Sequence, residues 1–161
     1  DPKLRWPFLS FSQTLPATKV TDVFNPNGDE NCGFRCIAKT LYEDQEKFGL
    51  VKSTMLETLV EGERFYKAIQ IFPDYEHLVQ TVSYADDGSF VPQKYWFSTP
   101  DCAQLAADAF RRPIECHTPH GPTLYLPLNN TTYSSFKPII LQLHASHFFL
   151  VTIKSGKRDL P

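Results

Sequence analysis

Two apolar runs near the C-terminal end constrain the fold of this 161-residue chain more than any other feature. Residues 138–143 and 147–154 are rich in Ile, Leu, Val and Phe, and only residues 144–146 separate them. Apolar runs of this length that end at polar residues are typical of buried strands, and a short connection joins such strands in a hairpin. We therefore expect this hairpin to form central strands of a sheet, with His147 opening the second strand.

The first half of the chain has apolar residues at helical spacing instead. The predicted helices are residues 32–42, two helices within 51–71 that break near Glu61 and Gly62, one that opens at Pro73, and one that begins at Pro100. For the last of these, Ser98 and Thr99 place a capping hydroxyl before a proline at the first helical position. An exposed loop is expected at residues 84–94.

Shorter extended segments complete the predicted sheet. Residues 114–117 and 123–126 are expected to form strands on either side of a turn at 119–122, and residues 21–24 also look extended. Helices in the first half and strands in the second predict an α+β fold, or an α/β fold if the early strand joins the sheet.

A cysteine stands where a polar turn gives way to the first predicted helix. The segment Asp29, Glu30, Asn31 and Cys32 follows a strong turn signal at residues 25–28. At the first helical turn, unpaired N–H groups and the positive end of the macrodipole favour a thiolate, which is the reactive form of cysteine. Cys32 is thus the candidate nucleophile, and the backbone of Glu30, Asn31 and Cys32 is the candidate oxyanion site.

A histidine is the candidate base. Thiol proteases bring cysteine and histidine together in space and seldom in sequence, so the long separation from Cys32 to His147 does not count against the pair. His144 competes for the same role, but it is equally explained as a hairpin residue without a chemical function. We select His147.

Composition excludes several classes of protein. The formal net charge is −2, and acidic and basic residues intermingle, so nothing suggests a nucleic-acid surface. No apolar run has the length needed to cross a membrane. The four cysteines lack the spacing of a disulfide scaffold, which favours a reducing compartment, the cytoplasm or the nucleus. The 42% hydrophobic content suits one domain with a sizeable core.

The motifs around the two candidate residues resemble those of the OTU (ovarian tumour) family of cysteine proteases, most of which are deubiquitinases. The first family motif resembles Asp-Gly-Asn-Cys followed by an aromatic residue and Arg, matched here by residues 29–36. The final motif is a histidine followed by an aromatic residue, matched by His147 and Phe148. Residues 95–100, 105–106 and 113–115 resemble the Trp-containing turn, helix and strand between them. The Gly-Phe-Arg and His-Phe variants look most like transposon-associated members.

This resemblance implies a papain-like α+β fold, with helices around a small central sheet, over a single domain at 1–161 whose residues 1–20 form an N-terminal arm. It implies hydrolysis of isopeptide bonds at the C-terminus of ubiquitin or polyubiquitin, with Cys32 as nucleophile and His147 as base. Asp29 would either orient the cysteine turn, residues 29–32, or assist the oxyanion through its backbone. We expect no cofactor and no metal. Because the chain begins with Asp1, we expect a domain excised from a larger protein. We also expect this domain to be monomeric.

Two positions depart from the family pattern. Glu30 occupies the glycine position of the usual turn, where its carboxylate would raise the thiol pKa if it faced Cys32. Phe149 stands where many members carry the Asn or Asp that orients the histidine. Asp22, Asn31 or Thr152 are possible substitutes, and a Cys/His dyad without a third residue is another solution.

Other interpretations remain open at this stage. The fold is also compatible with a catalytically impaired ubiquitin-binding or scaffold domain, or with a protease for another ubiquitin-like modifier. Cys36, Cys102 and Cys116 are interpreted as structural, because a single cysteine on an apolar helix side is usually a core residue. A zinc site built from Cys32, Cys36, Cys116, His117 and His120 is disfavoured, since these spacings match no common zinc pattern. Trp96 is interpreted as a core or turn anchor, and the acidic pair Asp86 and Asp87 as a solvated turn.

Overall fold

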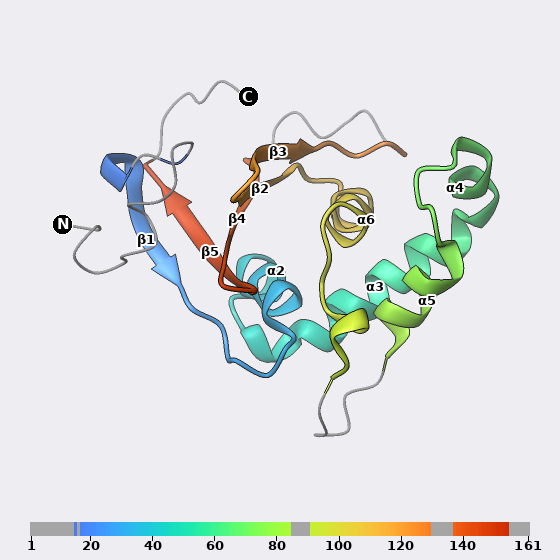
Figure 1. Ribbon diagram of the computed structural model, residues 1–161, viewed down its shortest axis with the longest axis horizontal. Coiled ribbons are helices and arrows are strands. Elements are labelled where there is room, and N and C mark those ends of the chain that lie inside the picture. The colour runs from blue at the N-terminus through green and yellow to red at the C-terminus, as the bar shows by residue number, and fades with distance from the viewer. Residues whose placement is uncertain (1–14, 16, 85–90, 130–136, 155–161) are drawn as a thin grey trace.

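The computed structural model describes residue 15 and residues 17–84, 91–129 and 137–154, and these contain five α-helices and five strands (Figure 1). The helices are α2 (Cys32–Tyr42), α3 (Phe48–Glu61), α4 (Glu63–Ile69), α5 (Tyr75–Ser83) and α6 (Asp101–Phe110). The strands are β1 (Val20–Phe24), β2 (Ile114–Thr118), β3 (Gly121–Tyr125), β4 (Ile139–His144) and β5 (His147–Ile153). The predicted α+β class is confirmed. The early strand joins the sheet as β1, but it pairs antiparallel with β5, so it does not make the fold α/β.

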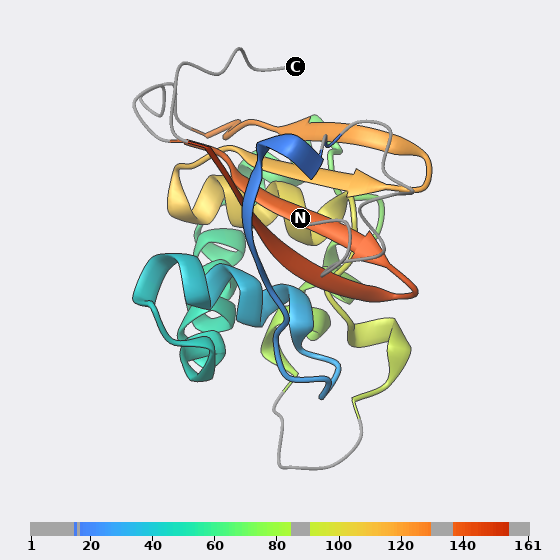
Figure 2. The ribbon, with the colours of Figure 1, turned by 90° about the vertical axis from the view of Figure 1, so that its left-hand side faces the viewer.

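The strands form one sheet in the order β1-β5-β4-β2-β3. All neighbouring strands are antiparallel except β2 and β4, which run parallel. The predicted hairpin of β4 and β5 is therefore central, as expected from its apolar residues. Figure 2 shows β1 running down the edge of this sheet toward the start of α2.

The hairpin turns on two residues with left-handed backbone. Ala145 has φ 50° and Ser146 has φ 64°, and His144 is paired with His147 across the turn. Two consecutive residues with positive φ are typical of a two-residue turn whose twist matches that of the flanking strands. The turn fixes the register of β5, so that this strand begins at His147.

The two faces of the sheet have different apolar neighbours. Along β4, Ile139 and Leu141 belong to the main core with the helices, whereas Ile140 belongs to a smaller cluster with Leu15, Val20, Val23 and Val151. This is the alternation expected when both faces of a strand are covered. In Figure 1, α6 lies between β2–β3 and α3, and α2 lies beside β5.

The predicted helix over 32–42 is confirmed with those bounds, and the break between α3 and α4 falls at Gly62. The predicted start of α6 is wrong. Pro100 occupies the N-cap position without a side-chain cap, and the helix begins one residue later. The carbonyl of Ser98, rather than a hydroxyl, accepts the N–H of Cys102 at 3.0 Å. A main-chain group therefore satisfies an N–H donor in the first turn of the helix.

Several predicted segments lie outside the described residues. These are most of the arm at 1–20 and the tip of the predicted 84–94 loop with Asp86 and Asp87. Among the described residues, none of the helices has both the length and the apolar character that a membrane span requires.

Candidate active site

Cys32 is the first residue of α2 and lies beside the start of β5. Its side chain belongs to the main core, and only 8% of the residue is exposed. Asn31 occupies the N-cap position, and no side-chain hydrogen bond caps the helix there. The thiol therefore lies at the positive end of the helix dipole but in a poorly hydrated position.

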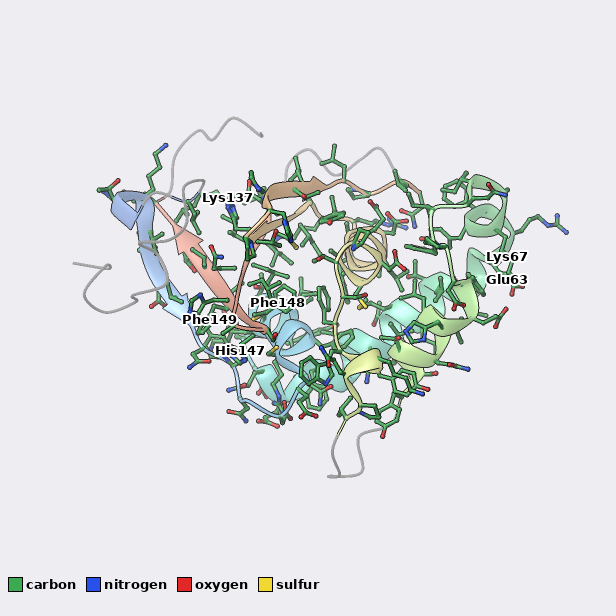
Figure 3. The ribbon with its side chains drawn as sticks, viewed as in Figure 1. Glu63, Lys67, Lys137, His147, Phe148 and Phe149 are labelled. Carbon is green, nitrogen blue, oxygen red and sulfur yellow. The ribbon has the colours of Figure 1, made fainter. Side chains whose placement is uncertain are left out.

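The backbone of Phe148 joins this thiol to the strand that carries the candidate base. Its N–H donates to Sγ of Cys32 at 3.4 Å, and its carbonyl accepts from Sγ of Cys36 at 3.6 Å. Cys32 and Cys36 lie one helical turn apart, so both thiols hold the same residue of β5. Figure 3 shows His147, Phe148 and Phe149 together at the end of β5 nearest α2. His147 is thus the chain neighbour of the residue bound to Cys32.

Three phenylalanine rings pack against one another beside the contact between Cys32 and β5. The ring of Phe97 makes edge-to-face contacts with Phe34 at 5.2 Å and with Phe148 at 5.3 Å between centroids. Phe34 is two residues after Cys32, and Phe148 is next to His147, so one ring braces both segments. The helix approaches Phe97 closely, because a Cβ built on Gly33 would lie 2.4 Å from its ring.

The imidazole of His147 is held from two directions. Its Nε2 lies 2.8 Å from Oδ1 of Asn25, and its ring makes an edge-to-face contact with Phe149 at 4.8 Å. Asn25 thus takes the place for which the sequence offered Asp22, Asn31 or Thr152. Asp22 and Thr152 instead face each other in the β1–β5 ladder.

Asn25 is the residue that the sequence interpretation missed. It was read only as part of the turn at residues 25–28, because nothing local marks it as a partner of a histidine 122 residues later. The signal that would have found it is the pairing of β1 with β5, which places the end of β1 beside the start of β5.

Asp29 acts through the shape of the cysteine turn. Its two carboxylate oxygens accept from Nε and Nη2 of Arg35, a side chain that is only 6% exposed, and one oxygen also accepts the N–H of Asn31 at 3.2 Å. Burial alone would raise the pKa of Asp29, but the hydrogen bonds from Arg35 and Asn31 outweigh it and hold the pKa below its ordinary value. Of the backbone groups expected at the oxyanion site, the N–H of Asn31 is thus already engaged.

Glu30 takes the backbone conformation that favours glycine. Its φ is 74°, and its carboxylate accepts the N–H of Val91 at 2.9 Å. The carbonyl of Val91 accepts the indole N–H of Trp96 at 2.9 Å, so Trp96 is a turn anchor as expected. The side chain of Glu30 therefore joins the cysteine turn to the segment at residues 91–96.

The electrostatic surroundings favour neutral forms of both candidate groups. Burial raises the pKa of the Cys32 thiol, and the N–H groups of Phe148, Gly33 and Cys32 oppose this without cancelling it. Asp29, rather than Glu30, adds a further upward contribution. Burial lowers the pKa of His147. The thiolate expected from the helix dipole alone is therefore disfavoured in the unliganded protein.

The remaining titratable candidates have structural positions. Cys36, Cys102 and Cys116 are free, buried thiols, and His144 is exposed at the hairpin. His117 and Glu115 form a buried pair on β2, with Nε2 and Oε2 2.9 Å apart. Within the described ranges, no group of three or more His, Cys, Asp or Glu residues is arranged to hold a metal ion.

Comparison with known proteins gives a match in structure alone. No family model matches the sequence, and no curated protein matches it at a significant level. The structure is similar to that of the OTUD1 OTU domain, with a TM-score of 0.56 and 15% identity over 81% of this chain and 84% of that one.

Two viral structures are similar to the same extent. The viral OTU domain protease from Qalyub virus has a TM-score of 0.54 and 16% identity, covering 83% of this chain and 84% of its own. That from Dera Ghazi Khan virus has a TM-score of 0.53 and 14% identity, covering 84% and 88%. With its helices, sheet order and cysteine-to-strand junction already described, the chain has the fold of an OTU domain.

Proposed function

We propose that this protein is a cysteine-type deubiquitinase, which hydrolyses isopeptide bonds at the C-terminus of ubiquitin. The observation that carries the proposal is the hydrogen bond between Sγ of Cys32 and the N–H of Phe148. It joins the cysteine at the start of α2 to the residue beside His147, in a chain that has the OTU fold. The similar structures support the fold alone, because their identity to this chain is low, and the substrate is inferred from the motifs around Cys32 and His147.

In this proposal Cys32 is the nucleophile and His147 is the base. His147 takes the thiol proton as sulfur attacks the carbonyl carbon of the ubiquitin C-terminal glycine, and the carbonyl oxygen becomes an oxyanion. The C–N bond then breaks, and His147 gives its proton to the leaving lysine amine. Water, deprotonated by His147, hydrolyses the thioester to a carboxylate and regenerates the thiol.

The cysteine turn has two roles in the reaction. The N–H groups of Cys32 and Glu30 are the proposed oxyanion donors. That of Cys32 is one of the first N–H groups of α2, which have no partner within the helix, and that of Glu30 belongs to the turn that precedes the helix. Asp29 contributes by fixing this turn through Arg35 and the N–H of Asn31, and not by contact with substrate. The neutral state of Cys32 and His147 implies that proton transfer accompanies attack, instead of preceding it.

The test is hydrolysis of a fluorogenic ubiquitin C-terminal amide and of diubiquitins by three purified proteins. Wild type should cleave, Cys32→Ala should not, and Cys116→Ala should retain cleavage because Cys116 is a core thiol on β2. Cys32→Ala should still fold and bind ubiquitin. Cleavage by pure Cys32→Ala would reject the nucleophile assignment. Wild type that binds ubiquitin without cleaving it would favour the scaffold function. Cleavage of another ubiquitin-like modifier, without cleavage of ubiquitin, would show that this modifier is the substrate.

A further inference from the structure

The imidazole of His147 has a polar partner from a distant part of the chain. Its Nε2 lies 2.8 Å from Oδ1 of Asn25. Asn25 directly follows Phe24, the last residue of β1, and precedes Pro26. It belongs to the connection that leads from the sheet to the cysteine turn, so a single segment carries both this amide and the thiol.

The sheet register explains why this amide reaches the ring. β1 pairs with β5 so that Phe24 lies opposite Leu150, and the next residue, Asn25, comes beside Phe149. Pro26 is buried, and a residue that precedes proline is restricted to extended backbone, which directs the chain along β5. Phe149 contacts the ring of His147 edge-on at 4.8 Å. The polar contact of His147 thus comes from Asn25, directly after β1, and its apolar contact comes from Phe149 on β5.

The chemistry of an amide oxygen determines the proton position on the imidazole. Oδ1 of asparagine accepts hydrogen bonds and cannot donate them, so Nε2 of His147 carries the proton and donates it to Asn25. A neutral imidazole has one protonated nitrogen, and the other holds a lone pair. Nδ1 of His147 is therefore the nitrogen that is able to accept a proton.

We propose that Asn25 is the positioning residue for His147, and that Nδ1 of His147 is the atom that exchanges a proton with Cys32. The catalytic part of this inference rests on the proposed function. Asn25 touches neither thiol nor substrate in this role. It holds the ring in one orientation and one tautomer, and a neutral amide does so without adding charge beside the thiol.

Kinetics with three variants test the positioning role. Asn25→Ala should lower kcat about 10–100-fold with KM nearly unchanged, since loss of a residue that orients a reacting group typically has this effect. Asn25→Asp keeps an oxygen acceptor at the same place and should restore most of the activity. Asn27→Ala is the matched control, because Asn27 lies in the same connection and its side-chain amide donates to Oε1 of Glu46, at 3.4 Å. Equal kcat for wild type and Asn25→Ala, or equal losses for Asn25→Ala and Asn25→Asp, would overturn the proposal.

Nitrogen NMR of the His147 ring gives a readout that a merely structural residue would not move. Wild type should show protonated Nε2 and unprotonated Nδ1 at neutral pH, and Asn25→Ala should shift the ring toward a mixture of tautomers, with an unchanged midpoint of urea unfolding. Identical ring spectra in both proteins, or protonated Nδ1 in wild type, would contradict the assignment. This measurement needs no substrate, so it decides the role of Asn25 independently of whether ubiquitin is hydrolysed.

Discussion

Glu30 and Val91 are joined by a hydrogen bond of 2.9 Å between a side-chain carboxylate and a main-chain N–H. The bond joins the cysteine turn to Val91, whose carbonyl accepts the indole N–H of Trp96. Glu30 stands at the glycine position of the usual turn, and its side chain fixes the turn through this hydrogen bond. Its backbone is left-handed, with φ 74°, and this conformation is strained for a residue other than glycine.

Substitutions at Glu30 should separate the contact from the backbone strain. Glu30→Ala loses the hydrogen bond and keeps the left-handed residue, whereas Glu30→Gly loses the bond and relieves the strain. We therefore expect Glu30→Gly to be about 1 kcal/mol more stable than Glu30→Ala in urea unfolding. Glu30→Gln, which keeps an acceptor, should retain more hydrolytic activity than either. Equal stability of the Gly and Ala variants would show that the positive φ is not strained.

Gly33 should not tolerate even one methyl group. An alanine Cβ there would lie 2.4 Å from Cγ of Phe97, in a core that is closed by Phe34 and Phe148. We expect Gly33→Ala to lower the free energy of unfolding by about 1–3 kcal/mol, despite the better helix propensity of alanine. Gly49→Ala is the control in α3, where a Cβ meets nothing within 4 Å, and it should be neutral or stabilising. Equal effects of the two substitutions would refute the close approach.

The Asp29–Arg35 pair should stabilise the protein in a pH-dependent way. Because the pKa of Asp29 is lower in the folded than in the unfolded protein, its contribution is present above the unfolded pKa and disappears as pH falls through the folded one. Asp29→Asn should therefore destabilise the protein by about 1 kcal/mol at pH 7, because solvent partly screens a carboxylate whose side chain is 35% exposed. The loss, measured as the difference from wild type in urea unfolding, should shrink as pH falls below 3.8, the ordinary pKa of this carboxyl.

An ion pair on the surface provides the comparison for Asp29. Glu63 and Lys67 lie 3.3 Å apart on α4, with half of each side chain exposed, at the opposite end of the molecule (Figure 3). Glu63→Gln should leave stability nearly unchanged at both pH values, because exposed pairs contribute little. A cost of Asp29→Asn that is the same at pH 7 and pH 3 would contradict the role of its charge.

The pKa shifts of Cys32 and His147 predict slow alkylation at neutral pH. Burial raises the pKa of the thiol and lowers that of the imidazole, so both groups are neutral at pH 7 and little thiolate is present. The rate of Cys32 alkylation by iodoacetamide should rise with pH beyond about 8.5, the ordinary pKa of a thiol. Cys32→Ser gives the background. A rate that reaches its plateau below pH 7 would instead indicate a thiolate–imidazolium pair in the free protein.

Local patterns in the sequence predict much of the fold. The apolar runs of β4 and β5, the helix at 32–42 and the break at Gly62 each depend on residues within a few positions of one another, and all three are confirmed. The start of α6 was wrong because a main-chain carbonyl took the role predicted for a hydroxyl. Capping residues compete with backbone groups for the same N–H donors, and sequence alone does not decide that competition.

The candidate site depends more on contacts between distant segments. Cys32 and His147 were selected from motifs, but the contact of Cys32 with Phe148 spans 116 residues. Asn25 was not selected, since only the register of β1 on β5 brings it to the ring of His147. The pKa of Cys32 was expected to fall because of the helix dipole, and burial, which depends on the packed core, reverses the direction.

Covalent capture by ubiquitin that carries an electrophile at its C-terminus decides whether Cys32 is the nucleophile. Attack by a thiol that is held beside the ubiquitin tail forms a stable bond, so mass spectrometry locates the reacting cysteine. We expect one adduct, on Cys32, that Cys32→Ala abolishes and Cys116→Ala retains. Reversible binding of the probe without an adduct, or an adduct on another cysteine, would contradict it.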